Sequence, residues 1–315
     1  MFDDIKDRLQ GCVYTIFTPF DAAEKVDYAA LDRYIEHIYR TGGRKFYAMA
    51  YNSRYSQLTH AEIMELNAFC IRKVKALDKR NIAIVGDPIH GSTKETIEFT
   101  RHAKETGADL ISLLVQEKYF SDDQIMDHYA EVARATHMGI LVHEMPFLSG
   151  MNGVQMHWPH SLFRELPKVP EIVALKEDAK DFETTCVALA LEPRIRVVIA
   201  GRKSVFMNCR GHGARAYLNG ISMLDARIGE TFWRAYEAND EKTITFILQS
   251  LEAPFFDKCC AKFGWHRCNK ALLQAAGFMH RRDRKPLKHL SDADYAVIEA
   301  VYREIGPALA KLTAQ

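Results

Sequence analysis

The chain has 315 residues, of which 48% are hydrophobic and 26% charged, a composition that fits a globular protein with a sizeable core and excludes a disordered or fibrous one. Its 42 Lys and Arg residues nearly balance its 41 Asp and Glu residues, so no overall positive charge would attract a nucleic acid. No apolar run approaches the roughly 18 residues of a membrane span, so a membrane is not expected as a partner either.

The cysteines and the first ten residues indicate the cellular compartment to expect. Seven cysteines is an odd number, and Cys12, Cys70, Cys186 and Cys209 stand alone in the sequence. The opening MFDDIKDRLQ lacks the basic and apolar regions of a signal peptide. We therefore expect a cytoplasmic protein with free thiols.

Short apolar runs alternate with longer stretches whose apolar residues recur at helical spacing, which predicts repeated strand–helix units. The predicted strands cover residues 11–17, 45–50, 81–86, 109–115, 139–143, 171–176, 196–200 and 213–219. The clearest helices are predicted over 27–40, 60–77 and 92–106. Ser92 and Glu95 have the spacing of a helix capping box.

Eight such units favour a closed (β/α)8 TIM barrel, an α/β fold, over an open doubly wound sheet. An open sheet would carry a Gly-rich phosphate-binding turn after its first strand, whereas this chain continues with Thr18-Pro19-Phe20. Towards the end the strand signal disappears and helical periodicity continues. We predict a barrel over residues 1–238 and a C-terminal helical region, packed on the barrel, over 239–315.

Lys176 ends the apolar run 171–176, and the ends of barrel strands are where catalytic groups lie. Strand alternation predicts that Lys176 and Ala174 face the interior while Val173 and Leu175 face the helices. Desolvation would lower the pKa of the amine and make it available to attack a carbonyl carbon, which is Schiff-base chemistry. The alternative is a lysine whose amine simply reaches solvent.

The sequence around Lys176, IVALKEDAKD at 172–181, resembles the lysine motif of the dihydrodipicolinate synthase/N-acetylneuraminate lyase family of class I aldolases and dehydratases. The resemblance extends over about three quarters of the chain. Further matching positions are Thr18-Pro19-Phe20, Val26-Asp27, Leu58-Thr59, Glu62, Gly107-Ala108-Asp109, Pro146, Gly150 and Gly201.

The stretch Tyr51-Asn52-Ser53-Arg54 departs from that family. Members usually have a GxTGE-like loop here, which binds the carboxylate of a 2-oxo acid. Asn52 and Ser53 could still donate hydrogen bonds, and Arg54 replaces the usual acid, so we expect altered carboxylate recognition. Tyr51 could supply a hydroxyl over the barrel mouth. For Arg54, an ordinary polar surface turn is the alternative.

A second departure follows the fifth strand, where the chain reads His143-Glu144-Met145-Pro146-Phe147-Leu148. His143 replaces the family's proton-transferring tyrosine, and Leu148 stands where the synthases have an arginine, which argues against dihydrodipicolinate synthase itself. Histidine titrates near pH 6.5, so His143 could transfer a proton directly at neutral pH, although a structural role is the alternative. Glu144 is a second acid/base candidate, provided that the chain turns there. Asn219, near the end of the last strand, could bind substrate, or could be an ordinary loop residue.

Taken together, the resemblance implies a Schiff-base lyase, expected to dehydrate a 2-keto-3-deoxy sugar acid, with His143 taking the C3 proton. A pyruvate-releasing retro-aldolase is the alternative within the family, and a non-catalytic barrel that binds a small acid is the alternative outside it. The resemblance also implies a homotetramer or a dimer, and a reaction that needs no metal, flavin or nicotinamide.

A metal site at Cys259, Cys260, His266 and Cys268 is not expected. Adjacent cysteines on a helix cannot easily point to one ion, and no second CxxC pair is present.

Overall fold

Eight parallel strands of the computed structural model close into a barrel in the order β1-β10-β9-β8-β5-β4-β3-β2. The structure describes residues 2–48, 52–89, 91–115, 121–144, 147–148, 155–156, 158–178 and 181–314. The barrel strands are β1 (Gly11–Thr15), β2 (Lys45–Ala48), β3 (Ile82–Gly86), β4 (Leu110–Leu113), β5 (Ile140–His143), β8 (Ile172–Glu177), β9 (Arg196–Ile199) and β10 (Ala216–Leu218). The predicted (β/α)8 barrel is therefore confirmed.

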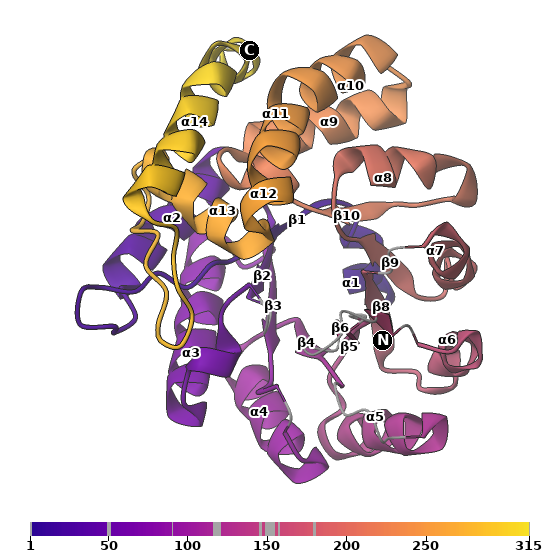
Figure 1. Ribbon diagram of the computed structural model, residues 1–315. Helices are drawn as coiled ribbons and strands as arrows, with labels where there is room; N and C mark the ends of the chain where they lie inside the picture. Colours follow the sequence, from indigo (N-terminus) through magenta and orange to yellow (C-terminus); the bar gives the residue numbers. More distant parts are fainter. Residues whose placement is uncertain are drawn as a thin grey trace.

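The helices form a ring outside the strands (Figure 1). Those of the barrel are α2 (Tyr28–Arg40), α3 (His60–Leu77), α4 (Thr93–Thr106), α5 (Asp122–Thr136), α6 (His160–Glu165), α7 (Phe182–Leu189), α8 (Lys203–Asn208) and α9 (Ala226–Ala238). Asp27 caps α2 through its side chain, and Ser92 and Glu95 form the predicted capping box of α4. A short antiparallel pair, β6 (Phe147–Leu148) with β7 (Gln155–Met156), follows β5 and was not predicted.

Hydrophobic side chains fill the barrel interior. They come from Leu9, Val13, Tyr47, Ile82, Ile84, Leu110, Leu141, Val173, Ala174, Val198, Ala216 and Leu218. The prediction that Val173 faces the helices is wrong, because the β5–β8 register shifts between Ile140 and Leu141 and turns two consecutive residues of β8 inward. Beyond this irregularity the alternation from Ala174 to Lys176 holds.

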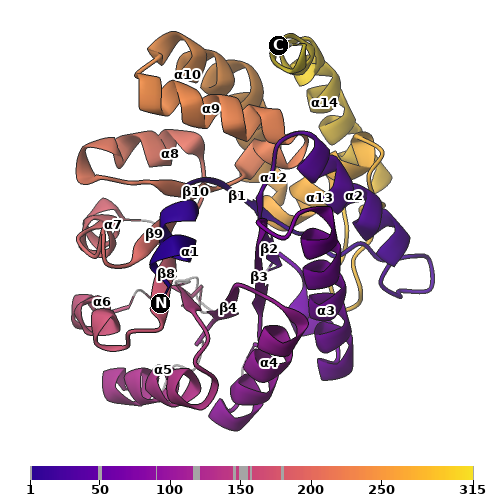
Figure 2. The same cartoon turned by 180° about the vertical axis from the view of Figure 1, so that it is seen from behind.

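The N-terminal opening of the barrel is covered by α1 (Asp3–Arg8), which lies beside β8 and β9 in Figure 2. Leu9 belongs to the interior cluster, and Phe2 and Ile5 pack against it. The polar groups at the opposite, C-terminal ends of the strands therefore lie at the end of the barrel away from α1.

Helices continue after the barrel and pack against α9 and one another (Figure 1). They are α10 (Glu241–Ile247), α11 (Ala253–Phe255), α12 (Ala261–Phe263), α13 (Trp265–Ala275) and α14 (Asp292–Thr313), with π-helical turns at Leu248–Glu252 and Phe256–Cys260. The division of the chain after residue 238 stays a prediction. All seven cysteines are free. Among the described residues, no helix has both the length and the hydropathy to cross a bilayer.

Candidate active site

The pairing of β5 with β8 places His143 directly opposite Lys176 at the C-terminal ends of the two strands. Lys176 is 1% exposed and His143 is fully buried. Each follows an interior residue by two positions, Leu141 on β5 and Ala174 on β8. Strand alternation therefore brings the imidazole and the amine together above the apolar interior.

The amine of Lys176 has a carboxylate partner that sequence reasoning missed. Its Nζ lies 2.7 Å from Asp178 Oδ2. Because Asp178 is two residues beyond Lys176, the same strand alternation could have identified it. A proton must leave the amine before it can add to a carbonyl carbon, and Asp178 is placed to accept that proton.

Both ring nitrogens of His143 lack a hydrogen-bond partner among the described residues. Burial lowers the pKa of His143 well below its ordinary value, the positive charge of Lys176 lowers it further, and Asp178 opposes both. The imidazole is therefore neutral at physiological pH and has a lone pair with which to accept a proton.

Glu144 turns toward the end of β8. Its backbone N–H donates to Lys176 O at 3.0 Å, and its Oε2 accepts the Asp178 backbone N–H at 3.1 Å. Burial, together with Glu177 and Asp178, raises its pKa to about 7, against the opposing effects of the Asp178 N–H and Lys176. Oε1 has no partner in the described part of the chain. A buried carboxyl with this pKa can hold or release a proton near neutrality.

The predicted carboxylate-binding stretch lies after β2, and Tyr51 falls outside the described residues. Asn52 is 1% exposed, and its Oδ1 has no partner among the residues described. The Ser53 hydroxyl donates to Ile16 O at 3.0 Å, so its one hydrogen is already in use. Arg54 donates from Nε and Nη2 to the two carboxylate oxygens of Asp283, both at 3.2 Å. The structure therefore pairs Arg54 with the C-terminal region.

Asn219 lies just beyond β10 and is 1% exposed. Its Oδ1 accepts a hydrogen bond from Thr15 Oγ1 at 2.9 Å, whereas its Nδ2 has no described partner. Its backbone oxygen accepts from Lys203 Nζ at 3.0 Å. An amide held at one end and unpaired at the other can donate to a ligand.

Two further buried titratable residues, Asp87 and His266, were not predicted as site residues. Asp87 follows β3, is 4% exposed, accepts from Thr96 Oγ1 at 2.8 Å, and has its pKa raised to about 7 by burial. His266, in the first turn of α13, is 8% exposed. Burial lowers its pKa well below the usual value, and the charges of Arg54, Lys270 and Lys176 lower it further. Asp87 fits the strand-end rule, but nothing in the sequence shows that α13 reaches the barrel mouth.

No group of three or more His, Cys, Asp or Glu side chains in the described part of the chain is arranged to hold a metal ion. Two of the cysteines near His266, Cys259 and Cys268, are buried in the hydrophobic core.

Comparisons with known proteins agree with this architecture. A model of the dihydrodipicolinate synthetase family matches residues 8–304. The 4-hydroxy-tetrahydrodipicolinate synthase of Laribacter hongkongensis is 23% identical over 303 residues, which cover 94% of this chain and 98% of that protein. The enzyme of the same name from Oceanobacillus iheyensis is 26% identical over 200 residues, which cover 62% of this chain and 64% of that protein.

Among solved structures, the 4-hydroxy-tetrahydrodipicolinate synthase of Methylacidiphilum fumariolicum SolV superposes with a TM-score of 0.82 at 21% identity, over 96% of this chain and 98% of the other. This likeness shows the shared barrel. Because the family model covers nearly the whole chain, from before β1 into α14, this protein belongs to the dihydrodipicolinate synthetase family, whose relatives include lyases.

Proposed function

We propose that this protein is a Schiff-base-forming lyase that acts on a 2-oxo acid, and that its reaction is dehydration of a 2-keto-3-deoxy sugar acid. The observation that carries the proposal is the buried Lys176 amine, 2.7 Å from Asp178 and opposite His143 at the C-terminal end of the barrel. The activity in the names of the relatives is not proposed for this chain, because Leu148 stands where the synthases have an arginine.

In the proposed reaction, Nζ of Lys176 adds to the keto carbon, and loss of water gives a protonated imine. The imine withdraws electrons from C3, and the neutral imidazole of His143 takes the C3 proton. The hydroxyl group at C4 then leaves as water with a proton from Glu144. A second water molecule hydrolyses the imine, which releases the product and restores the lysine.

The segment after β2 is proposed to receive the substrate carboxylate through Asn52, Ser53 and Arg54. Tyr51, which precedes them in the chain, is proposed to bind the substrate as well. For Ser53 the contribution comes from the backbone N–H, since the hydroxyl hydrogen is already donated. Arg54 has guanidinium hydrogens beyond the two that it gives to Asp283. The unpaired Nδ2 of Asn219 is proposed to bind a substrate oxygen.

Reductive trapping tests the chemistry. Borohydride added in the presence of pyruvate is expected to fix a covalent adduct on Lys176, identified by peptide mass spectrometry. Lys176→Arg keeps the charge but cannot form the imine, so it should remove the adduct. Lys73→Arg is the control at a partly buried lysine on α3 that pairs with Asp32 and Glu36, and it should keep the adduct. An adduct on a different lysine, or none in the unaltered protein, would reject the proposal, and binding of pyruvate without an adduct would favour a non-catalytic barrel.

Dehydration and retro-aldol cleavage differ in their products. With a 2-keto-3-deoxy sugar acid, dehydration keeps all carbon atoms in one molecule, whereas cleavage releases pyruvate. Measuring pyruvate with lactate dehydrogenase separates the two reactions. Pyruvate formed in step with substrate loss would favour the aldolase alternative. The tetramer or dimer and the cytoplasmic location stay predictions.

A further inference from the structure

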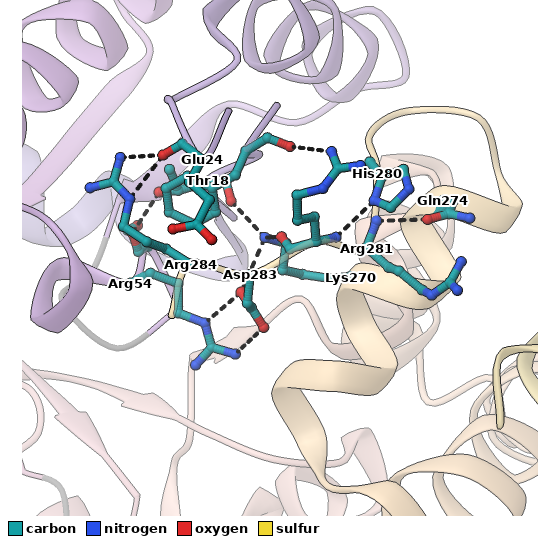
Figure 3. A network of polar contacts seen from close by, with 12 residues as sticks. Thr18, Glu24, Arg54, Lys270, Gln274, His280, Arg281, Asp283 and Arg284 are labelled. Carbon is teal, nitrogen blue, oxygen red and sulfur yellow. Dashed lines mark hydrogen bonds and ion pairs between the residues drawn. The ribbon is translucent and has the colours of Figure 1, made fainter. Parts of the chain in front are cut away.

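Three buried charged side chains from separate parts of the chain meet beside the segment Asn52–Arg54, called here the 52–54 segment (Figure 3). Arg54 is 7% exposed, Lys270 on α13 is 1% exposed, and Asp283 between α13 and α14 is 4% exposed. Arg54 holds the carboxylate of Asp283 with two donors at 3.2 Å, and Lys270 Nζ lies 3.2 Å from Oδ1. The single carboxylate of Asp283 therefore pairs with two buried cations, Arg54 and Lys270.

These contacts form a closed ring with the backbone. Lys270 Nζ also donates to Thr18 O at 3.0 Å and to Arg282 O. The hydroxyl of Thr18 donates to Ser53 O at 2.5 Å, and Ser53 precedes Arg54 in the chain. The ring thus runs from Asp283 through Lys270, Thr18 and Ser53 to Arg54 and back to Asp283. It holds the peptide between Ser53 and Arg54 from both sides.

The backbone at Arg54 gives a second, independent reason for such a support. Arg54 has φ 61° and ψ 34°, in the left-handed region that residues other than glycine seldom adopt. A residue keeps this conformation when its surroundings hold it there, and such positions gather at binding and active sites. Within the described residues, the side chain of Arg54 is anchored on Asp283 and the preceding carbonyl on Thr18.

The balance of charge makes Asp283 the central member of the ring. Without its carboxylate, the guanidinium of Arg54 and the ammonium of Lys270 would be left as two buried cations close together, which is unfavourable. Arg54 would then have no anchor for its side chain. Without Lys270, by contrast, the Arg54–Asp283 pair would remain, but its link to Thr18 would be lost.

We propose that Asp283 and Lys270 are positioning residues that act through Arg54 and Thr18. They hold the 52–54 segment in the conformation that receives the carboxylate of a 2-oxo acid. This inference rests on the proposed function. It means that the C-terminal helical region completes the binding site of the barrel, although its two residues need not touch the substrate.

The experiment measures borohydride trapping of pyruvate as a function of pyruvate concentration. In Asp283→Asn the half-saturating concentration should rise about tenfold, while the maximal trapping rate changes less than about twofold, because misplacing a binding group weakens binding before it affects the lysine. Lys270→Met, which leaves a neutral ion pair, should show the same change to a smaller degree. Asp283→Glu keeps the charge and should recover part of the affinity.

Asp292→Asn is the control, because Asp292, the first residue of α14, is itself exposed and pairs with Arg281 rather than with a member of the ring, and it should leave trapping unchanged. A role limited to stability would lower the melting temperature of the variants without altering their half-saturating pyruvate concentration, and that result in any folded ring variant overturns the inference. If the unaltered protein forms no adduct, the proposed function fails and the inference fails with it. If the unaltered protein forms the adduct but the variants keep its half-saturating pyruvate concentration, the inference alone fails.

Discussion

At the scale of single residues, two buried carboxyl groups make the stability of the fold depend on pH. Burial raises the pKa of both Asp87 and Glu144 to about 7. Between about pH 4 and 7 the folded protein keeps protons on these groups that the unfolded chain releases. The free energy of unfolding therefore falls as the pH rises through this window, and the loss is complete above pH 7.

Replacing Asp87 isolates its share of this effect. In Asp87→Asn, the drop in unfolding free energy between pH 5 and pH 8 should shrink by an amount on the order of 2 kcal/mol, because the amide does not ionise. Denaturant titrations at both pH values measure the drop. Asp257→Asn, at an exposed carboxyl group, should not change it. An equal drop in the Asp87 variant and the unaltered protein would contradict the assignment.

His143 provides a kinetic prediction at the same scale. His143→Gln should still form the trapped adduct at Lys176, because the amine is unchanged. Exchange of the pyruvate methyl protons with deuterated water should slow by roughly 10²-fold or more, since the proposed base for the C3 proton is missing. Proton NMR follows this exchange. His60→Gln, at a side chain that is 58% exposed, is the control. Undiminished exchange in the His143 variant would assign proton removal to another group.

Sequence reasoning located the two residues proposed to react, but not their surroundings. Lys176 and His143 were identifiable because each ends an apolar run, and parallel strands bring their carboxyl ends to one edge. Asp178 was missed even though strand alternation pointed to it. Asp283 could not be found in this way, because its contact with Arg54 joins residues 229 positions apart, across a connection between helices. Long-range side-chain partners of this kind leave no periodic signal.

At the scale of secondary structure elements, local signals set the helix boundaries well. His60–Leu77 has the predicted bounds, and Asp27 and Ser92 cap α2 and α4 through their side chains. Some strands are shorter at their carboxyl ends than predicted: β1 ends at Thr15 and β4 at Leu113, although the apolar residues Ile16, Phe17 and Leu114 that follow them are also buried. The short β6–β7 pair was missed, since two-residue strands produce no periodicity.

The capping box of α4 leads to a prediction at this scale. Ser92→Ala removes the hydroxyl that accepts from Glu95 N–H at 3.3 Å, and it should lower the free energy of unfolding by about 1 kcal/mol. Chemical denaturation measures the change. Ser56→Ala, at an exposed serine that caps no helix, should change stability by less than about 0.5 kcal/mol. Equal effects of the two substitutions would mean that the cap adds nothing.

At the scale of the whole molecule, the segment between α13 and α14 fastens the C-terminal helices to the barrel. Arg284 donates to both carboxylate oxygens of Glu62 on α3, at 2.8 and 2.9 Å, and also to Gln57 O at 2.9 Å (Figure 3 shows Arg284). Its side chain is 18% exposed. These charge-assisted bonds join α3 to the segment before α14 and lie outside the ring at Asp283.

Arg284→Met should loosen this attachment. The expected loss of unfolding free energy is on the order of 2 kcal/mol, because several charge-assisted hydrogen bonds disappear. Amide hydrogen exchange should increase at residues 276–291 more than in the barrel strands. Arg284→Lys should restore little, since an ammonium group cannot make the two-pronged contact with Glu62. Unchanged exchange in this segment would show that the apolar packing of α13 and α14 is sufficient to hold it.

The long separation between Arg54 and Asp283 has a consequence for biosynthesis. When a ribosome has just released the last barrel strand, which ends at Leu218, every strand is available for pairing, but Asp283 has not yet been translated. A nascent chain at that stage can assemble the sheet while the segment beside Arg54 still lacks its anchor. The 52–54 segment would then reach its final conformation late in synthesis, after the barrel itself has closed.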